Sequence, residues 1–450
     1  MMALQQLRHF VLHLGQAFDG HGFILLGAAA PIIKLNQPAC DGASRRRKED
    51  RALIQRMKSI FAIPRYPVLF LCMLLIGIGV SITTPYLALY FTEELGMSAT
   101  AFGIFMAASS LSGVLVNTGL ARHSDNGLNR KWLILAAAVG SMLAYLAYMT
   151  IHQYVLLLLL VSLLTGIGAI AVPQVYASAQ EAADASGSTD KPFAMSALRT
   201  LISVGFLTGP LAGTFVLTGY GYQGLFAATA GLYAVLAAFV LLFVHRAEPA
   251  VPAAARTSRA SMPSFRSKAF REPFLAFVLL FMANAFNTVH TPLFMVNEIG
   301  GTHADVGRMV SLCAGLEIPI LLVLGALGRH ISSPLLLRVG CLVGMLYGIV
   351  LASAGEVWQV MAAQVLQAIF VAIVMGNGLS YFMEWFPGSP GIAAAIYANA
   401  STLGRLLGNM GSGFAAEQLG FRNVYWAYLL LALLAYVYLH RNKRASPSAG

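Results

Sequence analysis

Long apolar runs limit what this chain can fold into more than any other feature of its sequence. Windows of about 20 apolar residues, the length that a helix needs to cross a bilayer, recur along the chain from position 67 onward. Only 10% of the 450 residues are charged, and the mean hydropathy is +0.72, whereas soluble domains carry about 25% charged residues. The sequence therefore predicts a polytopic membrane protein and excludes an ordinary soluble enzyme.

The apolar windows form two sets of six, which predicts an all-α protein with twelve transmembrane helices. A Pro- and Ala-rich segment with many basic residues separates the two sets and is typical of a solvated connecting loop. The expected spans lie near 67–91, 99–121, 132–151, 154–177, 193–218, 222–244, 273–298, 304–328, 335–353, 358–383, 391–416 and 422–440. The expected organisation is a tail at 1–64, a six-helix half at 65–244, a loop at 245–272, a second half at 273–440 and a tail at 441–450.

The residues ahead of the first span differ from the rest of the chain. Their short apolar stretch at 23–33 is too brief to cross a bilayer, and the polar, basic segment at 45–48 that follows it argues against a signal peptide. Met57 lies just ahead of the first span. We therefore favour a mis-called translation start over a disordered cytoplasmic tail for residues 1–56.

The basic residues predict the orientation of the spans. Of the 19 Lys and Arg after position 66, only Arg308 and Arg422 fall on the side opposite the termini, and Arg405 is embedded. Basic loops are retained in the cytoplasm, so both termini are expected to be cytoplasmic. The formal net charge of +11 is spread between spans, which argues against a nucleic-acid partner.

No cluster of residues indicates a cofactor or catalytic chemistry. The four cysteines lie far apart, three of them inside apolar runs, and are expected to be free thiols: Cys40, Cys72, Cys313 and Cys341. The loops are short and carry no nucleotide-binding motif, metal-ligand cluster or catalytic triad. We therefore expect neither an enzyme nor an ATP-driven pump, with no metal or cofactor.

An internal repeat relates the two halves. Gly205 and Gly209 of the fifth span recur as Gly404 and Gly408 of the eleventh, with Gly221 recurring as Gly420 at the same displacement of 199 positions. A second echo at a displacement of 204 to 207 joins the first hairpin (Pro85, Gly96, Gly103) to the seventh span and its following turn (Pro292, Gly300, Gly307). Two parallel six-helix repeats with polar groups near the midplane are the architecture of an alternating-access transporter.

Three motifs support a resemblance to a known family. Residues 119–131 read GLARHSDNGLNRK, which resembles the loop signature of the major facilitator superfamily, and residues 205–214 read GFLTGPLAGT, which resembles its antiporter motif. Close helix packing explains the second motif about as well as antiport does. Together with AGLEIP at 314–319 and PQVYASAQE at 173–181, the chain resembles the sugar efflux transporters of that superfamily.

The resemblance implies export of small sugars or glycosides, driven by a proton gradient, across a bacterial-type inner membrane. The expected carrier is a multi-pass monomer whose partners are the sugar, protons and the bilayer. The resemblance also implies a cytoplasmic gate in the 119–131 loop, although a simple positive-inside anchor with one incidental acid is the alternative. The gate residues would be Gly119, Asp125, Arg130 and Lys131.

Two embedded charges are candidates for proton coupling. Glu317 lies 12 residues from both Asp305 and Arg329 and Arg405 lies 12 residues from Glu417, which at 1.5 Å per residue puts both near the midplane. Such charges are costly unless they are paired or face a wet cavity. We expect a Glu317–Arg405 pair that exchanges a proton, with a permanent structural ion pair as the alternative.

Polar side chains on one face of the seventh span suit an uncharged polyol, because amides both donate to and accept from hydroxyl groups. Each of them could equally serve as an interhelical hydrogen bond. The expected substrate-binding residues are Asn284, Asn287, Thr288, His290, Glu317, Gln364, Gln367, Asn377, Asn399, Gln174 and Tyr86. Two rivals to sugar export stay open at this point: a multidrug–proton antiporter of the same fold, and a non-transporting sensor built on that fold.

Overall fold

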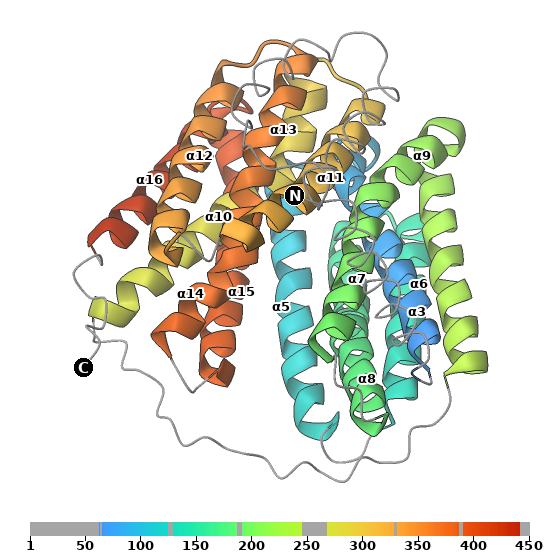
Figure 1. Ribbon diagram of the computed structural model, residues 1–450. Coiled ribbons are helices and arrows are strands. Elements are labelled where there is room, and N and C mark those ends of the chain that lie inside the picture. The colour runs from blue at the N-terminus through green and yellow to red at the C-terminus, as the bar shows by residue number, and fades with distance from the viewer. Residues whose placement is uncertain are drawn as a thin grey trace, which may run out of the picture.

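The computed structural model describes residues 63, 65–124, 129–186, 191–244, 268–327, 331–386 and 390–441. Every regular element within these ranges is helical, as the sequence predicts (Figure 1). The elements of the first part of the chain are α3 (Tyr66–Ser81), α4 (Thr84–Leu89), η2 (Tyr90–Glu94), α5 (Ala99–Ser124), α6 (Arg130–Thr150), α7 (Tyr154–Gly168), α8 (Ala171–Ala185) and α9 (Lys191–Phe243). Those of the second part are α10 (Lys268–Asn297), α11 (His303–Leu327), α12 (Ser333–Ser353), α13 (Val357–Val371), η3 (Ala372–Gly376), α14 (Asn377–Trp385), α15 (Pro390–Leu419) and α16 (Val424–Arg441).

Nine helical segments within the described ranges are long and apolar enough to cross a membrane. Their bounds are Tyr66–Glu94, Ala99–Gly119, Arg130–Thr150, Tyr154–Ala183, Ala197–Phe243, Phe270–Asn297, Ser333–Ser353, Val357–Trp385 and Val424–Arg441. The segment that ends at Phe243 folds back on itself at Gly221, where φ is 66°. The segment therefore consists of two helices joined at Gly221. Glycine suits this position because it adopts a positive φ without strain.

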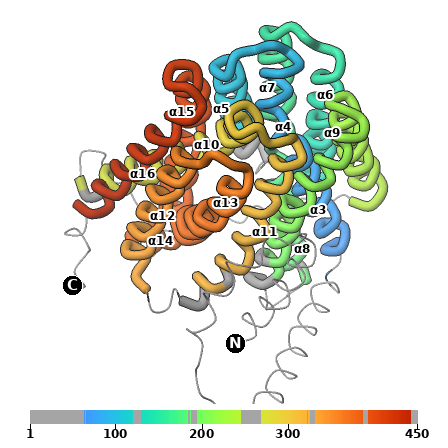
Figure 2. The backbone as a smooth tube through the Cα atoms, turned by 90° about the horizontal axis from the view of Figure 1, so that it is seen from above, coloured from blue at the N-terminus to red at the C-terminus, as the bar shows by residue number. Residues whose placement is uncertain are grey.

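The helices pack as two groups. The first group, α3 to α9, lies on one side of the molecule and the second group, α10 to α16, on the other (Figure 2). Within the first group α9 contacts α3 and α6, and within the second group α10 contacts α15 and α16. The groups meet mainly where α5 contacts α15 and where α9 contacts α11. That boundary is where a site accessible from both sides of a membrane belongs in a repeat transporter.

Glycines bring the helices of each group into equivalent contacts. A Cβ atom on Gly205 would stand 2.5 Å from the Gly77 carbonyl carbon, and one on Gly404 would stand 2.5 Å from the Phe281 Cβ. Gly205 and Gly404 are 199 positions apart, and Gly77 and Phe281 are 204 apart. The structure therefore supports the repeat that the sequence predicts, and close backbone packing explains why these positions are glycine.

The buried side chains are almost all apolar and form one large cluster across both groups and one smaller cluster within each. Cys72, Cys313 and Cys341 are free thiols, as expected, and Cys40 lies outside the described residues.

The two ends of the molecule differ. The upper end in Figure 1 is the end at which α5 and α11 begin and at which α10 and α15 stop, and the lower end is where α5, α8 and α14 stop. We use these two terms below.

Candidate functional site

A hydrogen-bonded network surrounds the polar face of α10. The Asn287 Oδ1 accepts hydrogen bonds from the hydroxyl of Thr291, at 2.6 Å, and from the hydroxyl of Tyr347 on α12. The Asn284 Oδ1 accepts a hydrogen bond from the Gln367 Nε2 of α13 at 3.3 Å. The face that the sequence predicts is therefore turned toward α12 and α13, within the second group.

Some buried polar atoms of the second group have no hydrogen-bond partner in the described part of the chain. Among them are the Gln367 Oε1, the Asn377 Nδ2 and the Ser311 Oγ, and Gln367 belongs to the network. Burying a donor or acceptor without a partner is costly. A ligand or water that supplies hydroxyl groups would satisfy these atoms. This observation does not depend on the spacing of polar residues along α10.

Two other expected substrate residues, Gln364 and Thr288, already form hydrogen bonds within their own helices. Gln364, which is 2% exposed, donates from Nε2 to the Val360 carbonyl of its own helix. The Thr288 hydroxyl donates to the Asn284 carbonyl, and Asn399 is exposed on α15. Gln364 and Thr288 can contribute to a site only if their side chains leave these intrahelical hydrogen bonds.

His290 lies in an aromatic enclosure. It is 1% exposed, its ring packs against Phe421 and Tyr425, and its Nε2 lies 2.6 Å from the Phe421 carbonyl oxygen. The Nδ1 of the same ring has no partner among the described residues. His290 therefore ties α10 to the turn before α16.

Tyr86 is also sealed off. Its side chain is fully buried and its hydroxyl donates to the Pro210 carbonyl at 2.7 Å, with Thr214 at the same distance. A Cβ atom on Gly307 would stand 2.2 Å from that hydroxyl. Tyr86 therefore packs at the contact between the two groups, near the upper end.

The expected ion pair between Glu317 and Arg405 is not formed. Both residues are described, and the ion pairs of the described residues join other partners. The cation that acts electrostatically on Glu317 is Arg199 of α9. The sequence places these residues at similar depth but does not say which helices face each other, and α11 contacts α9.

Arg199 and Arg405 converge on one residue of the second group. Both act electrostatically on Tyr397 of α15, whose hydroxyl donates to the Met375 carbonyl at 3.1 Å. Both arginines are exposed although they belong to long helices. A charged side chain inside a membrane-spanning helix requires water or a polar partner. Arg199 could have been singled out from its place inside the expected span 193–218.

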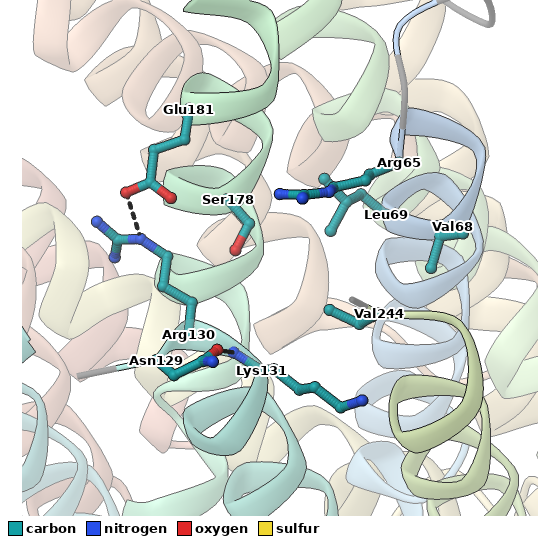
Figure 3. Close-up of a pocket in the computed structure, with 9 residues that line it drawn as sticks. All are labelled: Arg65, Val68, Leu69, Asn129, Arg130, Lys131, Ser178, Glu181 and Val244. Carbon is teal, nitrogen blue, oxygen red and sulfur yellow. Dashed lines mark hydrogen bonds and ion pairs between the residues drawn. The ribbon is translucent and has the colours of Figure 1, made fainter. Parts of the chain in front are cut away.

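The gate residues form a second cluster at the lower end of the first group (Figure 3). The Arg130 Nε donates to the Glu181 carboxylate of α8 at 2.7 Å, and its guanidinium also donates to the Gln174 Oε1 at 3.0 Å. The Asn129 side chain caps α6 by accepting from the Lys131 N–H at 3.0 Å. Gln174 therefore lies in the gate cluster and not beside the network of α10.

Lys131 ties the same cluster to α9. Its Nζ donates to the Leu241 carbonyl at 2.7 Å, where carbonyl groups at the end of a helix favour a cation. Together with Arg65, Asn129 and Arg130 it lines a pocket (Figure 3). Gly119 is exposed near the end of α5, and Asp125 lies outside the described residues.

The groups are joined by hydrogen bonds toward the upper end. The Thr100 N–H of α5 donates to the Glu417 carboxylate of α15 at 2.9 Å, and His303 of α11 contacts Glu93 of η2 at 2.8 Å. No role was expected for Glu93 or His303. Their places next to the ends of the expected spans 67–91 and 304–328 are the sequence signal that could have identified them.

Across the described ranges, no group of three His, Cys, Asp or Glu side chains is arranged to hold a metal ion.

Comparisons with known proteins show which family this chain belongs to. Residues 69–358 and 338–449 match the profile of the Major Facilitator Superfamily. Sugar efflux transporter A of Dickeya chrysanthemi is 30% identical over 346 residues, which are 76% of this chain and 86% of that protein. Sugar efflux transporter C of Escherichia coli K12 is 29% identical over 352 residues, which are 78% and 89% of the two chains.

Solved structures share the fold at low sequence identity. A nucleoside transporter superposes with a TM-score of 0.72 at 13% identity, over 84% of this chain and 99% of that one. A bacterial homologue of the human lysosomal transporter Spinster superposes with a TM-score of 0.70 at 14% identity, over 84% and 96% of the two chains.

The long apolar helices and these relatives identify a multi-pass membrane protein of a transporter family and not an enzyme. The chain belongs to the major facilitator superfamily and, within it, to the sugar efflux transporters.

Proposed function

We propose that this protein exports small sugars or glycosides in exchange for protons by alternating access. The relatives named as sugar efflux transporters support the substrate class, and the unpartnered buried amides of Gln367 and Asn377 support a ligand rich in hydroxyl groups. In this proposal twelve helices cross a bacterial inner membrane, both termini are cytoplasmic, and the carrier acts as a monomer.

The observation that carries the proposal is the position of Glu317 between the two groups. It is a carboxyl group on α11, it lies opposite α9, and Arg199 acts on it electrostatically. A carboxylate at this boundary gains or loses a proton as the cavity opens to one side or the other. Proton entry from outside neutralises Glu317, and release inside restores its interaction with Arg199.

Sugar binding and proton binding are linked through the same boundary. The amides that accept sugar hydroxyls lie on α10 and α13, and the charged residues lie on α9, α11 and α15. Arg405 and Arg199 supply donors that a sugar hydroxyl or the Glu317 carboxylate can use in turn. Competition between these two acceptors gives the exchange of sugar for proton.

The gate cluster fixes the positions of α6, α8 and α9 relative to one another at the lower end of the first group. In the proposed orientation this end faces the cytoplasm, and Arg130 and Lys131 fasten α6 to α8 and α9. Asp125 belongs to the same loop and serves as the acid of the gate. The cluster lies within one group, so it can persist while the groups move apart.

The test is sugar uptake into inside-out vesicles with and without an imposed pH gradient. Labelled lactose, a thiogalactoside and glucose are followed in parallel with a lipophilic dye, and vesicles that lack the protein are the control. Gradient-dependent sugar uptake supports the proposal. Movement of the dye without sugar favours a multidrug antiporter of this fold, and sugar binding without movement favours a sensor.

A further inference from the structure

Three side chains form a titratable bridge between the two groups at the upper end. The His303 Nε2 lies 2.8 Å from the Glu93 Oε2, and the Tyr222 hydroxyl lies 3.1 Å from each of these two atoms. Glu93 belongs to η2 and Tyr222 to α9, in the first group, whereas His303 is the first residue of α11, in the second group. The side chains of His303 and Glu93 are 33% and 30% exposed, so protons from the solvent reach them.

The bridge between His303 and Glu93 must break when the two groups separate at the upper end. In the described part of the chain, the other hydrogen bonds between the groups join Ser98 and Thr100 to Glu417 and Asn409 to Ser110. The gate bonds at the lower end stay within the first group. Opening the upper end therefore has to separate His303 from Glu93, and the strength of that contact contributes to the balance between the two access states.

Protonation changes the strength of this contact. The Tyr222 hydroxyl has one hydrogen to donate, so the Glu93 carboxylate needs a hydrogen from the His303 Nε2 to complete its share of the bridge. A neutral imidazole supplies it in only one of its two tautomers. An imidazolium supplies it always and adds charge attraction, because both ring nitrogens then carry hydrogen.

The charged group in contact with the ring is acidic. Glu93 contacts it from η2, and Tyr222 contacts it from α9 and is itself acted on electrostatically by Glu93 and Glu94. On its own helix, the Asp305 carboxylate lies two positions along the chain and pairs with Arg308 at 3.3 Å. Arg308, the cation of the same helical turn, is thus already paired. Histidine is the side chain whose charge ordinarily changes between pH 5 and 8.

We infer that His303 is a second proton-binding group of the transport cycle, whose protonation from the upper side fastens the upper end closed. The proton adds at Nδ1, since Nε2 faces Glu93. This inference rests on the proposed function: a carrier that exchanges sugar for a proton closes its outer end after it has released sugar and taken up the proton. An acidic outer medium then favours the closing step directly, in addition to neutralising Glu317.

The test measures closure of the upper end in the full chain as a function of pH, without any substrate. Spin labels are placed on cysteines introduced at Thr150 and Ser353, the exposed last residues of α6 and α12, in a background whose native cysteines are replaced by alanine. Reconstituted protein is examined from pH 5 to pH 8. As the pH rises from 5 to 8, we expect the population with the short distance to fall about fivefold relative to the population with the long distance. This is the scale of one partly exposed ion pair.

The variants separate titration from structure. His303→Gln keeps a side-chain N–H donor but does not titrate, so its distance ratio should not change with pH, and Glu93→Gln should lose the pH dependence in the same way. The matched control is His152→Gln, a histidine exposed in the turn between α6 and α7 at the same end, which should titrate as the parent protein does. Tyr222→Phe should shift the midpoint and keep the dependence.

Two results overturn the inference: a distance ratio that does not change with pH in the parent protein, or an unchanged pH dependence in His303→Gln. Neither bears on sugar transport, which the vesicle assay measures separately. If the vesicle assay shows no sugar exchange while the distances titrate, the proposed function fails and the pH-dependent closure stands as a property of the fold.

Discussion

Gly103 lies so close to the backbone of Asn409 that a Cβ atom on the glycine would stand 2.5 Å from the Asn409 carbonyl oxygen. Gly307 makes the matching approach to the Pro210 carbonyl oxygen, at 2.9 Å. The two glycines are 204 positions apart and the two carbonyl groups 199 apart, the displacements of the internal repeat. The repeat therefore governs the contacts between the groups, α5 on α15 and α11 on α9, as well as the packing inside each group.

This contact predicts that Gly103→Ala opens the upper end. The added methyl group meets backbone atoms that have no rotamer to change, and overpacking of this kind costs about 1–3 kcal/mol. Because the cost applies only when the upper end is closed, the equilibrium should shift toward the open state. Spin-label distances between positions 150 and 353 measure that shift.

Gly231→Ala is the control for this substitution. Gly231 lies inside α9, and a Cβ atom there would meet nothing within 4 Å, so the alanine should leave the distances as they are and stabilise the helix slightly. If Gly103→Ala gives the distances of the parent protein, the glycine contact does not limit closure.

Glu417 is expected to strengthen closure only while it is ionised. The Ser98 hydroxyl and the Thr100 backbone N–H lower the pKa of this carboxyl group. A lowered pKa means that closure is favoured above the ordinary value of 4.5 and loses this contribution as the pH falls through the lowered value. Glu417→Gln should weaken closure at neutral pH by about 1 kcal/mol, the scale of a lost helix cap.

The same distance measurement checks Glu417→Gln at pH 7. The comparison variant combines Glu417→Gln with Gln418→Glu, which keeps a carboxyl group on α15 but moves it one position away from Thr100. A parent-like distance ratio in Glu417→Gln would show that the contact contributes nothing to closure.

Glu317→Gln is expected to abolish the response of sugar transport to a pH gradient. The amide keeps the size of the side chain and cannot exchange a proton, so sugar should still equilibrate down its own gradient. Arg199→Gln removes the cation that acts on Glu317 and should move the pH optimum of exchange upward, because an unpaired carboxylate holds its proton more tightly. Vesicle uptake over a range of pH values measures both effects.

Arg338→Gln serves as the matched control for Arg199→Gln. Arg338 is a partly buried arginine whose Nε donates to the Pro334 carbonyl of its own helix α12. Its loss should leave the pH optimum of exchange in place. A parent-like gradient response in Glu317→Gln would remove this residue from proton coupling.

The sequence predicted the helical class and the repeat because both rest on local patterns. Apolar length defines a candidate span, and the recurrence of Gly205 at Gly404 reflects the same close contact in each group. The partner of Glu317 could not be predicted in this way. Depth follows from counting residues along one helix, whereas pairing depends on which helices face each other, and α11 faces α9 and Arg199 instead of Arg405.

The polar residues show the same limit. The spacing of Asn284 and Asn287 correctly put their side chains on one face, and α13 supplies the partner Gln367. Spacing says nothing about which amides are already satisfied. Gln174 was expected at the sugar site, but the structure places it against Arg130, a contact between α6 and α8 that no pattern within either helix encodes.

Asn377→Ala should weaken sugar binding by about fivefold, the loss that corresponds to one neutral hydrogen bond of roughly 1 kcal/mol. The Nδ2 of Asn377 is buried and has no partner among the described residues. Asn377 directly follows the π-helical turn η3, and such turns often mark functional positions in helices. Because no protein hydrogen bond is lost, stability should change little while the KM for sugar rises. Asn423→Ala is the matched control: its amide is exposed and donates to the Leu419 carbonyl at the upper end, so the KM should not change. An unchanged KM in Asn377→Ala would exclude this amide from the sugar site and move the search to Gln367 and Ser311.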